Sequence, residues 1–220
     1  MITPPVGLTA VIFDIDGTLL DSAAGIVAGF RHALRSVGFP PPSDAVLRSD
    51  LGPPVGPYFT SLGLDDALLE RAVAAYRSYY RAEGMHDAAA YPGIADLLVA
   101  LRQTLILGTA TAKRTETAAD ILDAHGLAGY FAAINGTDDR RTTKAETIAH
   151  TLELLGRPDP STVMMVGDRH SDIAGGQACG LFTVGVTWGY GSRTELVTAG
   201  ADTLVDRPGA LLDLVRRVSP

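Results

Sequence analysis

The sequence is short of cysteine, lysine and long apolar runs, and each shortage excludes a class of protein. Cys179 is the one cysteine among 220 residues, so no disulfide framework can form and a reducing, cytoplasmic compartment is expected. One cysteine with five scattered histidines argues against a structural zinc site. Apolar runs such as LILGTATA are too short to span a bilayer, and the opening MITPPVG lacks the basic and apolar regions of a signal peptide.

Basic charge is also scarce. The formal net charge is −7 and the isoelectric point is about 5.1, which argues against a nucleic-acid polymer or an anionic membrane surface as the partner. Lys113 and Lys144 are the only lysines among 18 basic residues. Because an ammonium and a guanidinium group are not interchangeable, these two positions are worth following through the sequence.

What the chain does have is a regular alternation of short apolar runs and helical stretches. With an apolar content of 46%, it can bury a sizeable core. Strands that alternate with helices predict an α/β fold with a Rossmann-like parallel sheet covered by helices on both faces. The expected strands are 10–15, 104–110, 130–135, 162–167, 182–187 and 201–206. The expected helices of this part are 114–126, 144–156, 171–180, 194–200 and 210–218.

The interval from Ser22 to Ala90 breaks the alternation. It contains helical patterns at 24–38, 44–52 and 66–84, separated by proline-rich stretches. We therefore expect an inserted α-helical cap domain at residues 22–90, and an α/β core made of residues 1–21 and 91–220.

Polar residues cluster where the expected strands end. In an open parallel sheet, ligands bind beyond the carboxyl ends of the strands, so these clusters should meet at one edge. The residues concerned are Asp14 and Asp16, Thr111 and Lys113, Asp168 and Asp172, and Lys144 at the start of a helix. Several carboxylates at one point repel each other unless a cation joins them, and an all-oxygen donor set suits Mg²⁺. A lysine and a hydroxyl beside such a cation indicate an anionic substrate, to which backbone amides of the GTATAK turn can also donate.

Four segments together resemble the motifs of the haloacid dehalogenase-like hydrolase superfamily. They are DIDGTLLDS, TATAK, TTKAE and VGDRHSDIAGGQACG. The tail VGVTWGYGSRTELVTAGADTLVD and the cap loop LGPPVGPYF resemble the phosphoglycolate phosphatase-like branch, in which a helical cap follows the first strand. The resemblance covers nearly the whole chain.

This resemblance implies a Mg²⁺-dependent phosphatase that acts on a small phosphorylated metabolite, as a monomer or a homodimer. It implies that Asp14 is the nucleophile and Asp16 the general acid and base. Mg²⁺ would be bound by Asp14, Asp168 and the backbone carbonyl of Asp16, with Asp172 close by or acting through water. The phosphoryl group would contact Thr111, Ala112 and Lys144, and Thr109 is an alternative to Thr111. Gly17, Lys113 and Tyr58 are the predicted substrate contacts.

Other activities of the same superfamily leave different signatures. Haloacid dehalogenases lack the second aspartate, which is Asp16 here, and phosphonatases need a cap lysine that this chain lacks. A phosphosugar mutase and a non-catalytic protein that binds a phosphorylated ligand stay open as alternatives. Within the phosphatases, phosphoglycolate, nucleoside monophosphates and sugar phosphates are all open. The stretch Gly52–Phe59 offers Tyr58 but no charge, which favours a substrate with hydroxyls or a ring over one with a second carboxylate.

Overall fold

The computed structural model describes residues 5–49 and 51–217, and it divides the chain into two compact units. Unit 1 consists of Met1–Leu20 and Ala90–Pro220, and unit 2 of Asp21–Ala89. Asp50 and Val218, which the sequence placed in helices, lie outside the described residues. Within the described ranges, no helix is both long and apolar enough to pass through a lipid bilayer.

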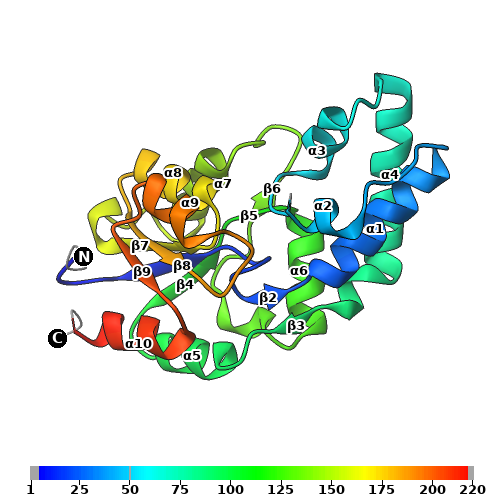
Figure 1. Ribbon diagram of the computed structural model, residues 1–220. Helices are drawn as coiled ribbons and strands as arrows, with labels where there is room; N and C mark the ends of the chain where they lie inside the picture. The colour runs from blue at the N-terminus through cyan, green and yellow to red at the C-terminus, as the bar shows by residue number, and fades with distance from the viewer. Residues whose placement is uncertain (1–4, 50, 218–220) are drawn as a thin grey trace. The chain divides into compact units, whose positions relative to one another are not determined.

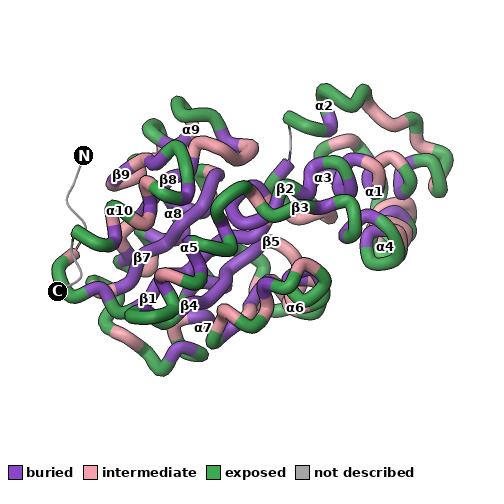
Figure 2. Tube along the Cα trace, turned by 90° about the horizontal axis from the view of Figure 1, so that it is seen from below, coloured by how far each residue is buried: buried purple, intermediate pink, exposed green. Residues whose placement is uncertain are grey.

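Unit 1 is built on a parallel five-stranded sheet, which confirms the predicted α/β class (Figure 1). The strand order is β4-β1-β7-β8-β9, and each neighbouring pair is parallel. The strands are β1 (Ala10–Phe13), β4 (Ile106–Thr109), β7 (Val163–Gly167), β8 (Phe182–Val186) and β9 (Thr203–Val205). The four residues of β1 are all buried, as expected of a central strand covered on both faces (Figure 2).

Helices cover both faces of this sheet. Helices α5 and α10 pack together on one face, while α7 and α8 pack together on the other (Figure 1). The helices of unit 1 are α5 (Ile94–Leu101), α6 (Thr115–Ala124), α7 (Lys144–Leu154), α8 (His170–Ala178), α9 (Arg193–Thr198) and α10 (Pro208–Arg216). Short 3₁₀ helices are η2 (Ala128–Tyr130) and η3 (Pro160–Thr162).

The expected strand at 130–135 is wrong for most of its length. Pairing with β4 in this stretch is limited to an isolated bridge between Gly108 and Ala133, after which the backbone turns to a different partner. The next strand is β6 (Gly136–Thr137), which pairs in parallel with β5 (Thr111–Arg114) in a separate two-stranded sheet. The chain therefore leaves the main sheet at Ala110 and continues as β5.

Unit 2 is mainly helical. Its helices are α1 (Ala23–Ser36), α2 (Asp44–Ser49), α3 (Val55–Ser61), α4 (Asp66–Ala82) and the 3₁₀ helix η1 (Gly84–Asp87). The chain runs into and out of this unit through β2 (Leu20–Asp21) and β3 (Ala89–Ala90), which pair with each other. Helix α3 corrects the expectation of a loop at LGPPVGPYF, because Pro57 lies in the first turn, where proline is tolerated.

Candidate active site

Two acidic residues follow neighbouring strands at the same edge of the main sheet. Asp14 comes directly after β1 and Asp168 directly after β7, and Phe13 at the end of β1 is in register with Val166 on β7. Because the strands are parallel, their carboxyl ends coincide and both carboxylates leave the sheet at that edge. Asp172, in the first turn of α8, joins them.

The structure brings these three carboxylates together. One oxygen from each of Asp14, Asp168 and Asp172 lies within 4.8 Å of the other two. The residues are 7%, 0% and 0% exposed. Such a buried set of oxygen donors fits a hard divalent cation and offers none of the sulfur or imidazole ligands that zinc prefers.

Lys144 is the one cation that contacts the carboxylate cluster among the described ion pairs. Its Nζ lies 3.1 Å from Asp14 Oδ1 and 2.8 Å from Asp172 Oδ1, and it donates to the carbonyl of Ala110 at 3.0 Å. Burial of this ammonium works to lower its pKa, but the carboxylates of Asp14 and Asp172 outweigh burial and hold the pKa above its ordinary value. Lys144 therefore stays charged.

Lys144 is positioned by the capping interactions at the start of α7. Thr143 is the N-cap, and its hydroxyl accepts a hydrogen bond from the Glu146 amide. The Glu146 carboxylate accepts hydrogen bonds from the amides of Thr142 and Thr143, which completes a capping box. Lys144 is thus the first residue of a helix whose start is well defined.

One ammonium does not neutralise three carboxylates, and burial together with the neighbouring carboxylates raises the pKa values of two of them. Burial, followed by the proximity of Asp172 and Asp14, raises the pKa of Asp168 to about 8. Burial also raises the pKa of Asp14 to about 6, with Asp172 and Asp16 adding to the effect and Lys144 opposing it. A divalent cation would relieve this repulsion, so the residues present fit a metal ion.

Both oxygens of Asp168 are held by neighbouring donors. The Thr18 hydroxyl donates to Oδ1 at 2.9 Å, and the Tyr190 amide donates to Oδ2 at 2.8 Å. Gly17 makes this approach possible, because its φ is +79° and a Cβ there would lie 2.3 Å from Asp168 Oδ2. The predicted closeness of Gly17 to the reacting groups has this structural basis, and its contact with substrate stays a prediction.

Asp16 and Lys113 form a second ion pair. The Asp16 carboxylate lies 2.7 Å from Lys113 Nζ, and the two side chains are 15% and 9% exposed. Asp16 belongs to the turn that follows β1, in which the amides of Leu19 and Leu20 both donate to the Ile15 carbonyl. Asp16 is not one of the three clustered carboxylates, but it is close enough to Asp14 to help raise the pKa of that carboxyl group.

The hydroxyls of Thr109 and Thr111 have different surroundings. The Thr109 hydroxyl accepts from the Asn135 amide at 3.0 Å and donates to the Asn135 carbonyl at 3.3 Å, so it bonds to the neighbouring backbone. The Thr111 hydroxyl accepts one long contact of 3.4 Å from the Lys113 amide. Of the two, Thr111 has the hydroxyl with more remaining hydrogen-bonding capacity.

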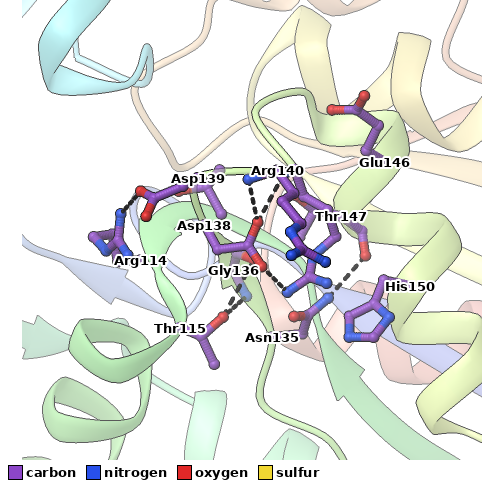
Figure 3. A network of polar contacts seen from close by, with 12 residues as sticks. Arg114, Thr115, Asn135, Gly136, Asp138, Asp139, Arg140, Glu146, Thr147 and His150 are labelled. Carbon is purple, nitrogen blue, oxygen red and sulfur yellow. Dashed lines mark hydrogen bonds and ion pairs between the residues drawn. The ribbon is translucent and has the colours of Figure 1, made fainter.

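Hydrogen bonds and an ion pair connect β5, which contains Ala112, to the segment that precedes α7 (Figure 3). The Thr137 hydroxyl donates to the Ala112 carbonyl at 3.1 Å. Arg114 pairs with Asp139 at 2.7 Å, and Asp138 accepts hydrogen bonds from the amides of Arg140 and Arg141 (Figure 3). These contacts order the segment that leads into Lys144.

Tyr58 lies in an aromatic cluster within unit 2. Its ring is 3% exposed and stacks on Phe30 with centroids 4.6 Å apart, and Phe59 and Tyr76 pack around the same phenylalanine. The structure thus assigns this side chain a packing role. Its predicted contact with substrate stays a prediction.

Sequence reasoning did not single out Asn135, Thr18, Tyr190 or Glu195. Asn135 carried a usable signal, because it is a polar residue directly after the apolar stretch YFAAI, as Asp14 is after AVIF. The amide of Tyr190 carries no signal, since a backbone donor has no side-chain identity. Glu195 is recognisable as a residue of a first helical turn, but its partners across the fold are not.

Comparisons with known proteins identify similar sequences and structures. The family model described as haloacid dehalogenase-like hydrolase matches residues 11–186. A 5'-nucleotidase of Pseudomonas aeruginosa is 35% identical, over 84% of this chain and 86% of that protein. A phosphoglycolate phosphatase of Neisseria gonorrhoeae is 34% identical, over 96% of this chain and 93% of that protein.

A differently named relative has higher identity. The tyrosine-protein kinase PtkA of Mycobacterium tuberculosis is 41% identical, over 93% of this chain and 70% of that protein. Among solved structures, a predicted phosphatase from Clostridium acetobutylicum superposes with a TM-score of 0.89 at 33% identity, over 96% of this chain and 99% of that one.

Proposed function

The chain belongs to the haloacid dehalogenase-like hydrolase family, and from this premise we propose that it is a Mg²⁺-dependent phosphomonoesterase that acts through an aspartyl-phosphate. Its relatives include enzymes named as phosphatases, and the chain is an enzyme of this hydrolase class. The metal ion, the intermediate and the substrate are the parts that we propose.

The arrangement of Lys144 carries the proposal. A buried ammonium 3.1 Å from Asp14 and 2.8 Å from Asp172, beside three carboxylates within 4.8 Å of one another, concentrates opposite charges at one point. Phosphoryl transfer needs positioning and charge neutralisation above all, and this cluster supplies both. A purely structural ion pair would not require the third carboxylate.

Asp14 and Asp16 take successive roles. A carboxylate oxygen of Asp14 attacks phosphorus and the phosphorus–oxygen bond of the ester breaks, while the Asp16 carboxyl group gives its proton to the leaving oxygen. The Asp16 carboxylate then takes a proton from water as that water attacks the phosphorus of the aspartyl-phosphate. The acyl phosphate bond breaks, inorganic phosphate leaves and the Asp14 carboxylate is restored.

The remaining residues bind and orient the phosphoryl group. Lys144 and the Thr111 hydroxyl donate hydrogen bonds to its oxygens, and the amide of Ala112 adds a backbone donor. Lys113, 2.7 Å from Asp16, holds that carboxyl group beside the leaving oxygen.

A Mg²⁺ ion would be held by the carboxylates of Asp14 and Asp168, the backbone carbonyl of Asp16 and, directly or through water, Asp172. When bound, it would neutralise charge on the phosphoryl oxygens. Burial and neighbouring carboxylates raise the pKa values of Asp14 and Asp168, and a bound cation would oppose both effects by favouring the ionised forms.

We propose that residues 22–90 act as the cap that selects the substrate, a small phosphorylated metabolite. Within this cap, the stretch 52–59 contains no lysine, arginine or histidine. A pocket without a cation compensates poorly for burial of a second carboxylate, so we expect nucleoside monophosphates and sugar phosphates to react faster than phosphoglycolate. A kcat/KM for phosphoglycolate at least tenfold above the others would overturn this preference.

The catalytic assignment is tested with Asp14→Asn, Asp16→Asn and the control Asp123→Asn, which changes an exposed residue of α6. Asp14→Asn should lower the hydrolysis of an aryl phosphate by about a thousandfold or more, because the covalent route is lost. Asp16→Asn should accumulate a phosphoenzyme visible by mass spectrometry. Activity of Asp14→Asn within tenfold of the wild type would refute the mechanism.

A second candidate is a phosphotransferase, favoured by the 41% identity to a protein named a tyrosine-protein kinase. ATP labelled at the γ-phosphate separates the two activities when the enzyme is supplied with a tyrosine-containing peptide. Release of label as inorganic phosphate supports the phosphatase. Transfer of label to the tyrosine hydroxyl, lost in Asp14→Asn, would establish the phosphotransferase.

A further inference from the structure

A short segment between β8 and α9 wraps around Asp168. We call residues 187–192 the strap. Its Tyr190 amide donates to Asp168 Oδ2 at 2.8 Å, and its Trp188 indole donates to the Thr18 carbonyl at 3.0 Å. Gly191 leaves no space for a side chain, because a Cβ there would lie 1.8 Å from the Asp168 carbonyl oxygen. The strap is therefore in close contact with one of the three clustered acids.

Glu195 connects the end of the strap to Arg169 and His170, which lie between Asp168 and Asp172 in the sequence. It lies in the first turn of α9, and its amide donates to the hydroxyl of Ser192, the last residue of the strap. Its Oε1 accepts hydrogen bonds from Arg169 Nε and from the His170 amide, both at 2.9 Å, and lies 2.9 Å from His170 Nδ1. One carboxylate oxygen thus serves two residues that directly follow Asp168.

Arg169 also contacts Asp172. Arg169 and His170 are the N-cap and the first residue of α8, and Asp172 Oδ2 accepts a hydrogen bond from the Arg169 amide at 3.0 Å. Lys144 contacts the other oxygen of Asp172. The backbone of Arg169 thus follows Asp168 directly in the chain and also donates a hydrogen bond to Asp172.

The Glu195 contacts are shielded from solvent and suited to its charge. The side chains of Glu195 and Arg169 are 23% and 14% exposed. A negative charge beside the first amides of α8 interacts favourably with the helix dipole. Although burial works against it, hydrogen bonds from His170 and Arg169 lower the pKa of Glu195 to about 2, so the charge persists at physiological pH.

We propose that Glu195 is a positioning residue, which fixes Asp168 and Asp172 at the separation that a bound Mg²⁺ requires by holding Arg169, His170 and the strap together. The inference rests on the proposed metal-dependent function. Partners behind metal ligands typically change metal affinity by about 10–100-fold when they are removed. Among the contacts of the described residues, Glu195 bonds to Arg169 and His170 rather than to the three clustered acids, so it acts through these two neighbours.

The chain offers a direct readout of Mg²⁺ binding that needs no substrate. Trp188 is its one tryptophan, and it lies in the strap two residues from the amide that bonds to Asp168. Titration of the protein with MgCl₂ is followed by Trp188 fluorescence, and the Mg²⁺ concentration for half-maximal hydrolysis of an aryl phosphate is measured in parallel. We compare the wild type with Glu195→Ala and Glu195→Gln.

Glu153 provides the matched control. It also pairs with an arginine and a histidine, Arg157 at 3.3 Å and His150 at 3.4 Å, but its side chain is 54% exposed and it lies in the last turn of α7. Glu195→Ala should raise both the dissociation constant and the half-saturating Mg²⁺ concentration by about tenfold or more. Glu195→Gln, which keeps an acceptor of similar shape, should give a smaller rise, and Glu153→Ala should leave both values within twofold.

The outcomes separate this inference from the proposed function. At saturating Mg²⁺, kcat of the Glu195 variants should return to within about threefold of the wild type, which a general loss of folded protein would not allow. Mg²⁺ affinity within twofold of the wild type in both Glu195 variants overturns the positioning role and leaves the proposed function standing. A wild type that hydrolyses phosphate esters equally well in chelator overturns the proposed function, and the inference with it. If Glu195→Ala does not fold, Glu195→Gln decides alone.

Discussion

A buried polar network should hold α7, and with it Lys144, against the main sheet. Asn135 Nδ2 donates to the Thr147 carbonyl at 2.9 Å and to the Thr151 hydroxyl at 3.0 Å (Figure 3 shows the Thr147 contact). The Thr151 hydroxyl lies within donating distance of the Thr109 carbonyl, at 2.9 Å. Asn135, Thr147 and Thr151 are 1%, 0% and 0% exposed, so none of them can exchange these bonds for bonds to water.

The hydrogen bonds of Asn135 determine how much its removal should lower the free energy of unfolding. Asn135→Ala deletes two buried hydrogen bonds worth about 1 kcal/mol each and leaves a small void, so it should lower the free energy of unfolding by about 2–3 kcal/mol. For a chain of this size that corresponds to a fall of about 4–12 °C in melting temperature. Thr151→Val keeps the shape of the side chain but removes the hydroxyl, and should cost about 1–2 kcal/mol.

The shared bond makes the two changes non-additive. The double variant loses the Asn135–Thr151 bond only once, so its cost should fall short of the sum of the single costs by about 1 kcal/mol. Urea unfolding followed by Trp188 fluorescence measures all four proteins, since the tryptophan lies in the same unit as the network. Thr198→Val, at an exposed position of α9, is the control and should stay within about 0.5 kcal/mol. Additive costs, or an Asn135→Ala cost below about 0.5 kcal/mol, would refute the reasoning.

Two further predictions concern other parts of the chain. Gly25→Ala should destabilise unit 2 by more than about 1 kcal/mol, because the new Cβ would lie 1.8 Å from the Gly84 carbonyl oxygen. The control is Gly56→Ala, whose new Cβ meets open space. Amide hydrogen exchange within α1 compares the two variants, and equal exchange would contradict the packing argument. Glu195 has a pKa lowered from 4.5 to about 2, so its stabilising charge is present above about pH 4.5 and is lost as the pH falls towards 2. The stability difference between the wild type and Glu195→Gln should therefore shrink between pH 5 and pH 3 in urea titrations, and a difference that stays constant would contradict this assignment.

Much of unit 1 could be predicted because its signals are local. β7 and β8 are short apolar runs, and the polar residue that follows β7, like the one that follows β1, marks the sheet edge where ligands bind. The capping pattern from Thr143 to Glu146 likewise predicts where α7 begins. The closeness of Asp14 and Asp168 then follows from the shared carboxyl edge of parallel β1 and β7, whereas Lys144 reaches them from the first turn of α7.

The rest depended on contacts that the sequence does not encode locally. The stretch LGPPVGPYF reads as a loop because of its prolines, yet a proline in the first helical turn lacks only an amide that would stay unpaired there, so α3 forms. The sequence predicts Tyr58 as a substrate contact, but it gives no sign of the tertiary packing on Phe30 that buries the ring. The sequence does not reveal the partners of Glu195, because they lie 25 and 26 positions away.

The central place of β1 has a consequence for how the chain is made. Ala10 pairs with Ile106 on β4 and with Val163 on β7, so β1 leaves the ribosome well before the two strands with which it pairs. At about 5–20 residues per second, the β7 partner follows after roughly 8–30 s. During that time AVIF is an exposed apolar segment of a kind that aggregates, and charged neighbours are the usual protection. Asp14 follows it directly and Asp16 two positions later, so we expect the acids of the finished site also to lower aggregation of the nascent chain.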